Sequence, residues 1–304
     1  MKNIASRAAG LALGLTTLVS AVPELARAAD PAPVVAAGHP ELWVAHGPQG
    51  TLYLLGSFHL LRPGAQWEDA RIDKALNSAD HVWFELTDFD DMALAQQIFV
   101  KYGLYDAPEL SQRLDKKELD HLGTALGRHG MTIDQVQRLK PWAAALLLAQ
   151  KELADDGFDG AQGVDLTLYH KALAAKKDVR GFETLDFQMG LLAHLDDHDG
   201  TSFLDETLDD DDEGTAKMSQ LADAWLHGNE AALTADSVTE MKADYPALYQ
   251  KMLVDRNNSW LPRIEDMART KGTTLIVVGA GHLVGPDGVV ARLRAAGFDV
   301  QRVP

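Results

Sequence analysis

The chain has 304 residues, carries a formal net charge of −17 and contains no cysteine. The acidic excess disfavours binding to nucleic acid or to anionic lipid, because both require clusters of lysine and arginine. The lack of cysteine excludes a disulfide framework, a thiol nucleophile and acylation at a lipoprotein cysteine.

The N-terminus has the pattern of a cleavable signal peptide. Lys2 and Arg7 precede a largely apolar run at residues 8–22, and Ala-Arg-Ala at residues 26–28 provides the small residues after which signal peptidase cuts. The run is shorter than the ~20 apolar residues that span a bilayer. We therefore expect residues 1–28 to be removed on export, with the periplasm as the simplest destination.

The rest of the chain is predicted to form one domain. Residues 29–40 are rich in alanine and proline and are expected to be a linker to a domain at residues 41–304. No later stretch approaches the length of a membrane-spanning helix. We expect no membrane anchor.

Strands and helices alternate at both ends of this domain, with helices between them. We expect strands at residues 41–46, 51–55, 81–86, 178–182, 273–278 and 299–303. We expect helices at residues 67–78, 163–175 and 288–296, and longer helical stretches at 90–154 and about 215–270. The first two strands flank a Gly-Pro-Gln-Gly turn that is typical of a β-hairpin. This order predicts an α/β domain with a central mixed sheet and large helical inserts.

Two of the predicted strands run into the same local pattern, Gly-x-x-His. Gly56 leads to His59 at the end of the second strand, and Gly279 leads to His282 at the end of the fifth. Glycine permits a sharp turn at a strand end, where open α/β folds bind their ligands. If the two strands are neighbours, the two imidazoles converge and could ligate a divalent metal such as Mn, Co or Zn.

Further polar residues could complete such a site. Glu85 and Glu183 each follow an apolar strand, and either could ligate the metal or act as a general base. Arg256 and Asn257 lie in a predicted helix and add a fixed cation and an amide that could hold a substrate carbonyl or an oxyanion. Taken singly, each residue also has a simpler interpretation as an ion-pair partner, a helix cap or a structural hydrogen-bonding group.

Two other motifs are rejected. Residues 279–285 imitate a dinucleotide-binding fingerprint, but the third glycine comes one residue late and the chain ends before a second mononucleotide-binding half. We therefore expect no nucleotide cofactor. Residues 194–198 carry two histidines four positions apart, as in a zincin helix, but lack the catalytic glutamate after the first histidine.

Short segments in a fixed order run along almost the whole domain, from Leu42 to Val303. They are Leu42-Trp43-Val44, residues 54–59, residues 79–85, Leu139-Lys140-Pro141-Trp142, Gly163-Val164-Asp165, Gly181-Phe182-Glu183-Thr184 with Gln188, Trp225 with Gly228-Asn229, Arg256-Asn257 and residues 278–285. In this order and spacing they resemble the TraB/PrgY/GumN family, which is related to the Tiki metalloproteases and more distantly to erythromycin-esterase and ChaN-like proteins.

The resemblance implies an active site with the two Gly-x-x-His histidines and a glutamate, as in the Tiki enzymes, which are regarded as metal-dependent proteases. Carried onto this chain, it makes His59, His282 and Glu85 the metal ligands, with Glu85 alternatively the base. Arg256 and Asn257 would contact the substrate or the transition state. Ser57 stands where the family often has threonine.

These observations lead us to expect a metal-dependent hydrolase that cleaves peptide bonds in a peptide or protein substrate outside the cytoplasm. The ion would lower the pKa of its bound water toward about 7 and polarise the scissile carbonyl. Glu85 or Glu183, whichever does not ligate the ion, would take the proton. Two alternatives stay open, a protein that captures a peptide or an envelope component without cleaving it, and an esterase that acts on a small molecule.

Overall fold

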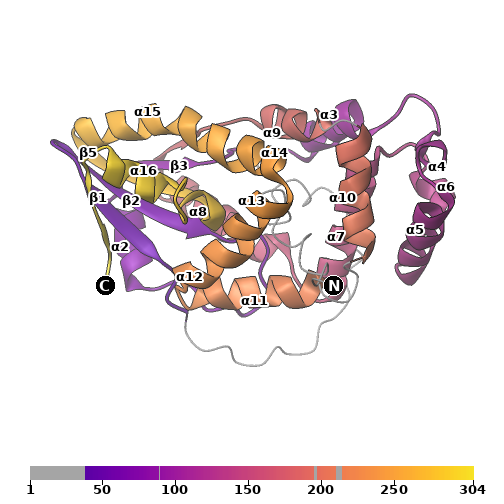
Figure 1. Cartoon of the computed structure of the whole chain (residues 1–304). Coiled ribbons are helices and arrows are strands. Elements are labelled where there is room, and N and C mark those ends of the chain that lie inside the picture. Colours follow the sequence, from indigo (N-terminus) through magenta and orange to yellow (C-terminus); the bar gives the residue numbers. More distant parts are fainter. Residues whose placement is uncertain (1–37, 89, 195–196, 210–213) are drawn as a thin grey trace.

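The structure of the protein is a computed structural model that describes residues 38–88, 90–194, 197–209 and 214–304. The predicted signal peptide at 1–28 and nearly all of the predicted linker lie outside the described residues. Within the described part, the strands gather at one end of the molecule and a helical body forms the other end (Figure 1).

Six strands form one mixed sheet in the order β4-β3-β5-β2-β1-β6. β1 and β2 make the predicted antiparallel hairpin, and β6 pairs antiparallel with β1. β2, β5, β3 and β4 run parallel to one another. The bounds agree with the predicted strands to within two residues: β1 (Leu42–His46), β2 (Gly50–Ser57), β3 (His81–Phe84), β4 (Asp178–Gly181), β5 (Gly272–Gly279) and β6 (Asp299–Arg302).

The two central strands carry the Gly-x-x-His motifs. Leu52, Leu54 and Leu55 of β2 and residues 275–278 of β5 are almost completely buried. Such continuous apolar runs are typical of parallel strands that are covered on both faces. The parallel register places the last residue of β2 beside the last residue of β5. The two motifs therefore begin side by side at one end of the sheet, which meets the condition under which the two imidazoles were expected to converge.

Helices pack on both faces of the sheet (Figure 1). Trp83 of β3 faces Arg263 of α15, whereas the next residue, Phe84, contacts Tyr169 of α8. Successive side chains of a strand point to opposite faces, so α15 and α8 cover opposite faces. The elements next to the sheet are α2 (Ala70–Ser78), η2 (Gly160–Gln162), α8 (Val164–Ala174), α15 (Asp255–Arg269), η5 (Ala280–His282) and α16 (Val289–Ala295).

The helical body consists of the segments between β3 and β4 and between β4 and β5. α10 packs along α7, and α9 packs against α3. The bounds are α3 (Met92–Gly103), α4 (Leu110–Arg113), α5 (Lys116–Arg128), α6 (Ile133–Val136), α7 (Pro141–Asp155), α9 (Leu185–Ala193), α10 (Asp197–Asp209), α11 (Gly214–Leu226), α12 (Glu230–Leu233), η3 (Thr234–Thr239), α13 (Glu240–Asp244), α14 (Pro246–Tyr249) and η4 (Gln250–Val254).

Local capping explains where several of these helices begin. The predicted helix at 67–78 starts at Ala70, because the side chain of Asp69 accepts hydrogen bonds from the first backbone N–H groups. α7 begins with Pro141, which suits the first turn of a helix because that turn needs no N–H from it.

The predicted helical stretch at about 215–270 is not continuous. It divides into five α-helices and two π-helical turns, η3 and η4. A π-helical turn accommodates an extra residue and is frequent at functional sites. η4 leads directly into α15, the helix that begins with Asp255, Arg256 and Asn257.

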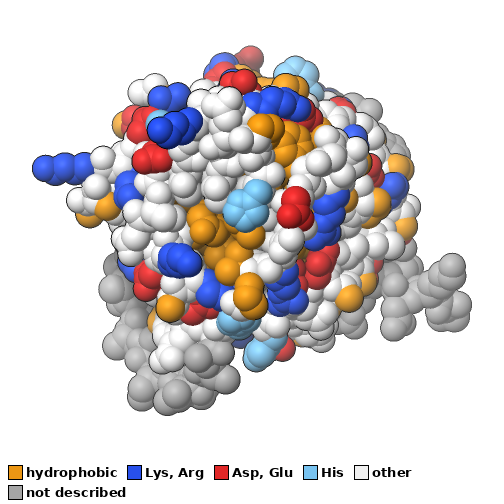
Figure 2. Space-filling view, turned by 90° about the vertical axis from the view of Figure 1, so that its left-hand side faces the viewer, with side chains coloured by type: hydrophobic (Ala, Val, Ile, Leu, Met, Phe, Trp, Pro, Cys, Tyr) orange, Lys and Arg blue, Asp and Glu red, His pale blue; other side chains and the backbone are white. Residues whose placement is uncertain are grey.

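On the face in Figure 2, basic and acidic side chains both lie around a hydrophobic patch that borders a histidine. Among the helices of the described residues, none combines the length and the apolar character needed to cross a bilayer.

Candidate active site

All six residues selected from the sequence meet at the carboxyl edge of the parallel strands. His59 follows β2, Glu85 follows β3, Glu183 follows β4 and His282 ends η5, directly after β5. Arg256 and Asn257 come from the first turn of α15. The six side chains are buried: His59, Glu85, Glu183, Arg256, Asn257 and His282.

Arg256 contacts three other members of this cluster, Glu85, Glu183 and His282. Its Nη2 donates to Glu85 Oε2 at 2.5 Å and to Glu183 Oε2 at 2.8 Å. Its Nε donates to Glu183 at 3.0 Å. Its Nη1 donates to the carbonyl of Met252 at 3.1 Å and meets Nε2 of His282 at 3.0 Å. All five N–H donors of the guanidinium are therefore engaged within the protein.

The two glutamates are held in different ways. Glu85 Oε1 accepts a hydrogen bond from the backbone N–H of Gly279 at 2.7 Å. Burial raises the pKa of Glu85, but the charge of Arg256 and the Gly279 N–H more than offset it and hold that pKa well below its usual range. Glu183 accepts from Trp260 Nε1 at 2.8 Å and from Gln188 Nε2 at 3.0 Å. Both carboxylates are thus occupied by donors.

His282 is fixed as a neutral imidazole. Asn257 donates through Nδ2 to two backbone carbonyls, so its Oδ1 is the acceptor of the 2.7 Å hydrogen bond from His282 Nδ1. The other ring nitrogen then presents a lone pair, which accepts from Arg256. Burial is the largest effect on the pKa of His282 and lowers it to about 3, with Arg256 reinforcing and Glu85 opposing the shift.

His59 is paired with a carboxylate that the sequence did not single out. Its Nδ1 donates to Asp165 Oδ2 at 2.6 Å, and the two side chains are 3% and 6% exposed. Burial lowers the pKa of His59, but the charge and the hydrogen bond of Asp165 more than offset it, so the net shift is upward. His59 Nε2 is buried and has no hydrogen-bond partner.

The contact between α8 and the first motif brings Asp165 to His59. The backbone N–H of Val164 donates to the carbonyl of Phe58 at 3.0 Å. A Cβ on Gly163 would lie 2.3 Å from the carbonyl oxygen of His59, so only glycine permits this approach. Gly163-Val164-Asp165 thus places a carboxylate beside the imidazole.

Gly279 lies between the candidate residues. A Cβ added to Gly279 would be 3.1 Å from Glu85 Oε1, 3.3 Å from His59 Nε2 and 3.7 Å from His282 Cδ2. The unpartnered nitrogen of His59 therefore lies beside Gly279, where any side chain would crowd both His59 and Glu85.

The predicted metal ligands fit a divalent ion in part. Among the described residues, no group of three or more His, Asp or Glu side chains has the arrangement of a metal site. His59 Nε2 and Glu85 Oε1 both lie beside Gly279 and are suitable donors, so these two would hold an ion. The lone pair of His282 Nε2 is taken by Arg256 and could join only if Arg256 moved away. The metal centre stays a prediction.

Arg256 and Asn257 use their hydrogen-bond donors within the protein. In this arrangement they position Glu85 and His282. Their expected contact with a substrate or a transition state stays a prediction. Sequence reasoning also missed Asp165, Gln188 and Trp260, although Asp165 and Gln188 belong to segments that carry the family resemblance.

The fold and this centre define an α/β protein with a buried cluster of histidine, glutamate and arginine at the ends of parallel strands. The chain belongs to the TraB/PrgY/gumN family, whose model matches residues 41–302. It is 22% identical over 280 residues to an uncharacterized protein of Treponema pallidum (strain Nichols), a match that covers 86% of this chain and 79% of that protein. No solved structure matches the chain significantly.

Proposed function

We propose that the protein is a hydrolase that cleaves peptide bonds outside the cytoplasm, with the buried centre around His59 as its active site. The observation that carries this proposal is the state of the imidazole. Its Nδ1 is held by Asp165, while its Nε2 is unpartnered and lies beside Gly279. This is the arrangement of an oriented general base.

His59 accepts the proton. Nε2 takes it from a water molecule as the water oxygen attacks the scissile carbonyl carbon, and returns it to the leaving amine as the C–N bond breaks. Asp165 keeps Nδ1 protonated, so the lone pair lies on Nε2, and it stabilises the imidazolium that forms.

The two glutamates support this step electrostatically. Glu85 and Glu183 both form ion pairs with Arg256, and the charge of Arg256 makes Glu85 a weak proton acceptor. With both imidazoles neutral, the three carboxylates of Glu85, Glu183 and Asp165 exceed the single guanidinium by two negative charges. This excess favours a positive charge beside Gly279, and the protonated ring of His59 provides one.

A bound divalent cation would balance the same negative excess. Held by His59 Nε2 and Glu85, it would activate the water in place of the free imidazole and would act as a Lewis acid on the carbonyl. Thermal melting with and without Mn²⁺, Co²⁺ or Zn²⁺ after chelation tests for it, with wild type compared to His59→Ala/His282→Ala. Ion at 100 times its dissociation constant adds about 2.7 kcal/mol to a protein with the site. An equal response of both proteins would mean that the ion meets only the acidic surface.

Peptide cleavage is tested directly by mass spectrometry. The purified protein is incubated with a peptide mixture, with chelator or with each metal. We expect cleaved products from wild type, none from His59→Gln, and undiminished cleavage by His227→Gln, which changes an exposed histidine elsewhere. Cleavage by His59→Gln at the wild-type rate would contradict the proposal.

Capture of a peptide without cleavage is the second candidate, and the burial of the centre favours it. The side chains of His59 and Glu85 are 3% and 4% exposed, which leaves little access for a substrate. Recovery of intact peptide bound to the protein, with no cleaved product under any metal condition, would support this alternative against the hydrolase.

A further inference from the structure

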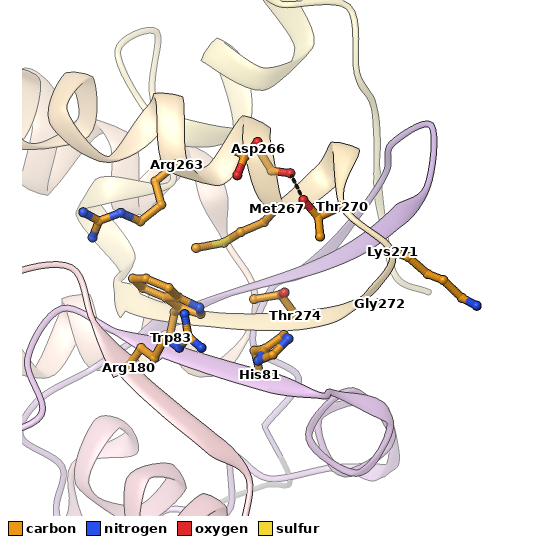
Figure 3. Close-up of a pocket in the computed structure, with 10 residues that line it drawn as sticks. All are labelled: His81, Trp83, Arg180, Arg263, Asp266, Met267, Thr270, Lys271, Gly272 and Thr274. Carbon is orange, nitrogen blue, oxygen red and sulfur yellow. Dashed lines mark hydrogen bonds between the residues drawn. The ribbon is translucent and has the colours of Figure 1, made fainter.

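A surface pocket of about 310 Å³ lies between helix α15 and strands β3, β4 and β5 (Figure 3). His81, Trp83 and Arg180 line it from the strands, and Arg263 and Met267 line it from the helix. α15 packs on β2, and its Arg263 lies over the ring of Trp83 on β3.

Two guanidinium groups approach the Trp83 ring in this pocket. The Cζ atom of Arg263 lies 5.3 Å from the ring centroid and that of Arg180 lies 5.8 Å from it. In Figure 3 the two groups come from opposite sides, Arg263 from the helix and Arg180 from the neighbouring strand. Two positive charges therefore lie close to one aromatic ring, although the chain as a whole has a net charge of −17.

The two cations differ in how far they are neutralised. Arg180 pairs with Asp178 at 2.7 Å, and the same carboxylate accepts from His81 at 2.7 Å. No carboxylate in the described parts of the chain forms an ion pair with Arg263. Asp266 also lines the pocket without pairing to it. A guanidinium that neighbours an aromatic ring and lacks a counter-ion is a recognition group for carboxylate or phosphate.

The pocket is separate from the candidate active site. Arg263 lies seven residues after Arg256 on α15, roughly 10 Å along the helix axis. The rings of Phe182 and Trp260 lie between Trp83 and His282. The ring centroids are 5.0 Å apart for Trp83 and Phe182, 5.1 Å for Phe182 and Trp260, and 4.5 Å for Trp260 and His282. No residue of the candidate active site lines the pocket.

We propose that this pocket binds a small organic anion, whose carboxylate or phosphate group is held by Arg263 and Arg180. The apolar part of the ligand lies against Trp83 and Met267. A volume of about 310 Å³ is at the lower end of the range for small-molecule sites, which matches a compact ligand. Asp266 favours a ligand that also carries a hydroxyl or ammonium donor.

Titration with citrate and with inorganic phosphate at constant ionic strength tests this site. Binding is followed by tryptophan fluorescence and by thermal melting. We expect a saturable response of the wild type to at least one anion. We expect about a hundredfold or greater loss of affinity in Arg180→Gln/Arg263→Gln, because each of the two charge contacts in a partly desolvated pocket is worth about 1.4 kcal/mol or more. A stronger response to citrate identifies carboxylate as the recognised group, and a stronger response to phosphate identifies phosphate.

The matched control is Lys74→Gln/Lys117→Gln, which removes the same charge from exposed positions on α2 and α5. It should bind as the wild type does. Trp83→Phe should lose the fluorescence change while the anion still raises its melting temperature. If the wild type responds to neither anion, or if the pocket variant and the control variant lose affinity equally, the proposal is wrong. Single Arg263→Gln repeats the test with the smallest change to the fold.

Discussion

Replacement of Asp165 by asparagine should change the proton affinity of His59. The 2.6 Å hydrogen bond between Asp165 and His59 is almost completely buried and joins a carboxylate to an imidazole. A hydrogen bond to a charged group contributes about 1.5–3 kcal/mol, and one pKa unit corresponds to about 1.36 kcal/mol. Asp165→Asn should therefore lower the pKa of His59 by about 1–2 units.

NMR titration of the histidine rings measures this shift without any substrate. The chain has 11 histidines, and the resonance of His59 is identified by its loss in His59→Gln. Asp178→Asn, which removes an exposed carboxylate beside His81, should leave the His59 titration unchanged. If Asp165→Asn also leaves it unchanged, the role that we assign to Asp165 is refuted. Peptide cleavage, where detected, should fall by roughly 10²–10⁴-fold in Asp165→Asn.

The same variant has a signature in stability. The pKa of His59 is raised in the folded protein, so its contribution is fully present below the unfolded value and is lost as the pH rises through the folded value. The difference in free energy of unfolding between wild type and Asp165→Asn should therefore be largest at mildly acidic pH and shrink above neutrality. Urea denaturation at a series of pH values measures this difference, and a gap that widens with pH would contradict the sign.

Two further variants test other charged groups. Arg256→Met leaves Glu85 and Glu183 buried without their cation, so it should lower the free energy of unfolding by about 3–5 kcal/mol. Arg263→Met on the same helix should change it by less than about 0.5 kcal/mol. Urea denaturation at neutral pH measures both, and equal effects would mean that Arg256 does not hold the buried cluster. Burial, opposed by Arg302 and reinforced by Glu230, raises the pKa of Glu41 to about 7, so its contribution to stability is lost as the pH rises from about 4.5 to about 7. Glu41→Gln should remove that loss. The free energy of unfolding of the variant relative to wild type should therefore be higher at pH 8 than at pH 5. If the pH dependence is the same in both proteins, Glu41 is not its source.

The sheet could be predicted because its local patterns are strong. Continuous apolar runs such as residues 275–278 marked strands that are buried on both faces, and the Gly-Pro-Gln-Gly turn marked the hairpin. Whether β2 and β5 are neighbours was left open by the sequence; their parallel pairing in the structure brings the two motifs to the same end of the sheet. The first residue of a helix was harder to predict. α2 was expected to start at residue 67, but it starts at Ala70 because the side chain of Asp69 caps it there.

Partner relationships within the site could not be predicted in the same way. Asp165 lies 106 positions from His59 and reaches it only through the packing of α8 on the first motif. The occupation of every donor of Arg256 depends on side-chain distances that no sequence pattern records. Candidate residues could therefore be found from strand ends, but their roles had to come from the hydrogen bonds that each one makes.

The π-helical turn η4 makes the geometry of the cluster depend on one residue of chain length. A π-helical turn carries an extra residue relative to an α-helix, and each residue rotates a helix by about 100°. Loss of one residue from η4 would restore a regular helix and turn the start of α15 by about that angle. Arg256 and Asn257 would then leave Glu85 and His282, while the apolar contacts that hold α15 on the sheet would oppose the rotation. The number of residues before α15 is thus constrained by the contacts that Arg256 and Asn257 make with Glu85 and His282.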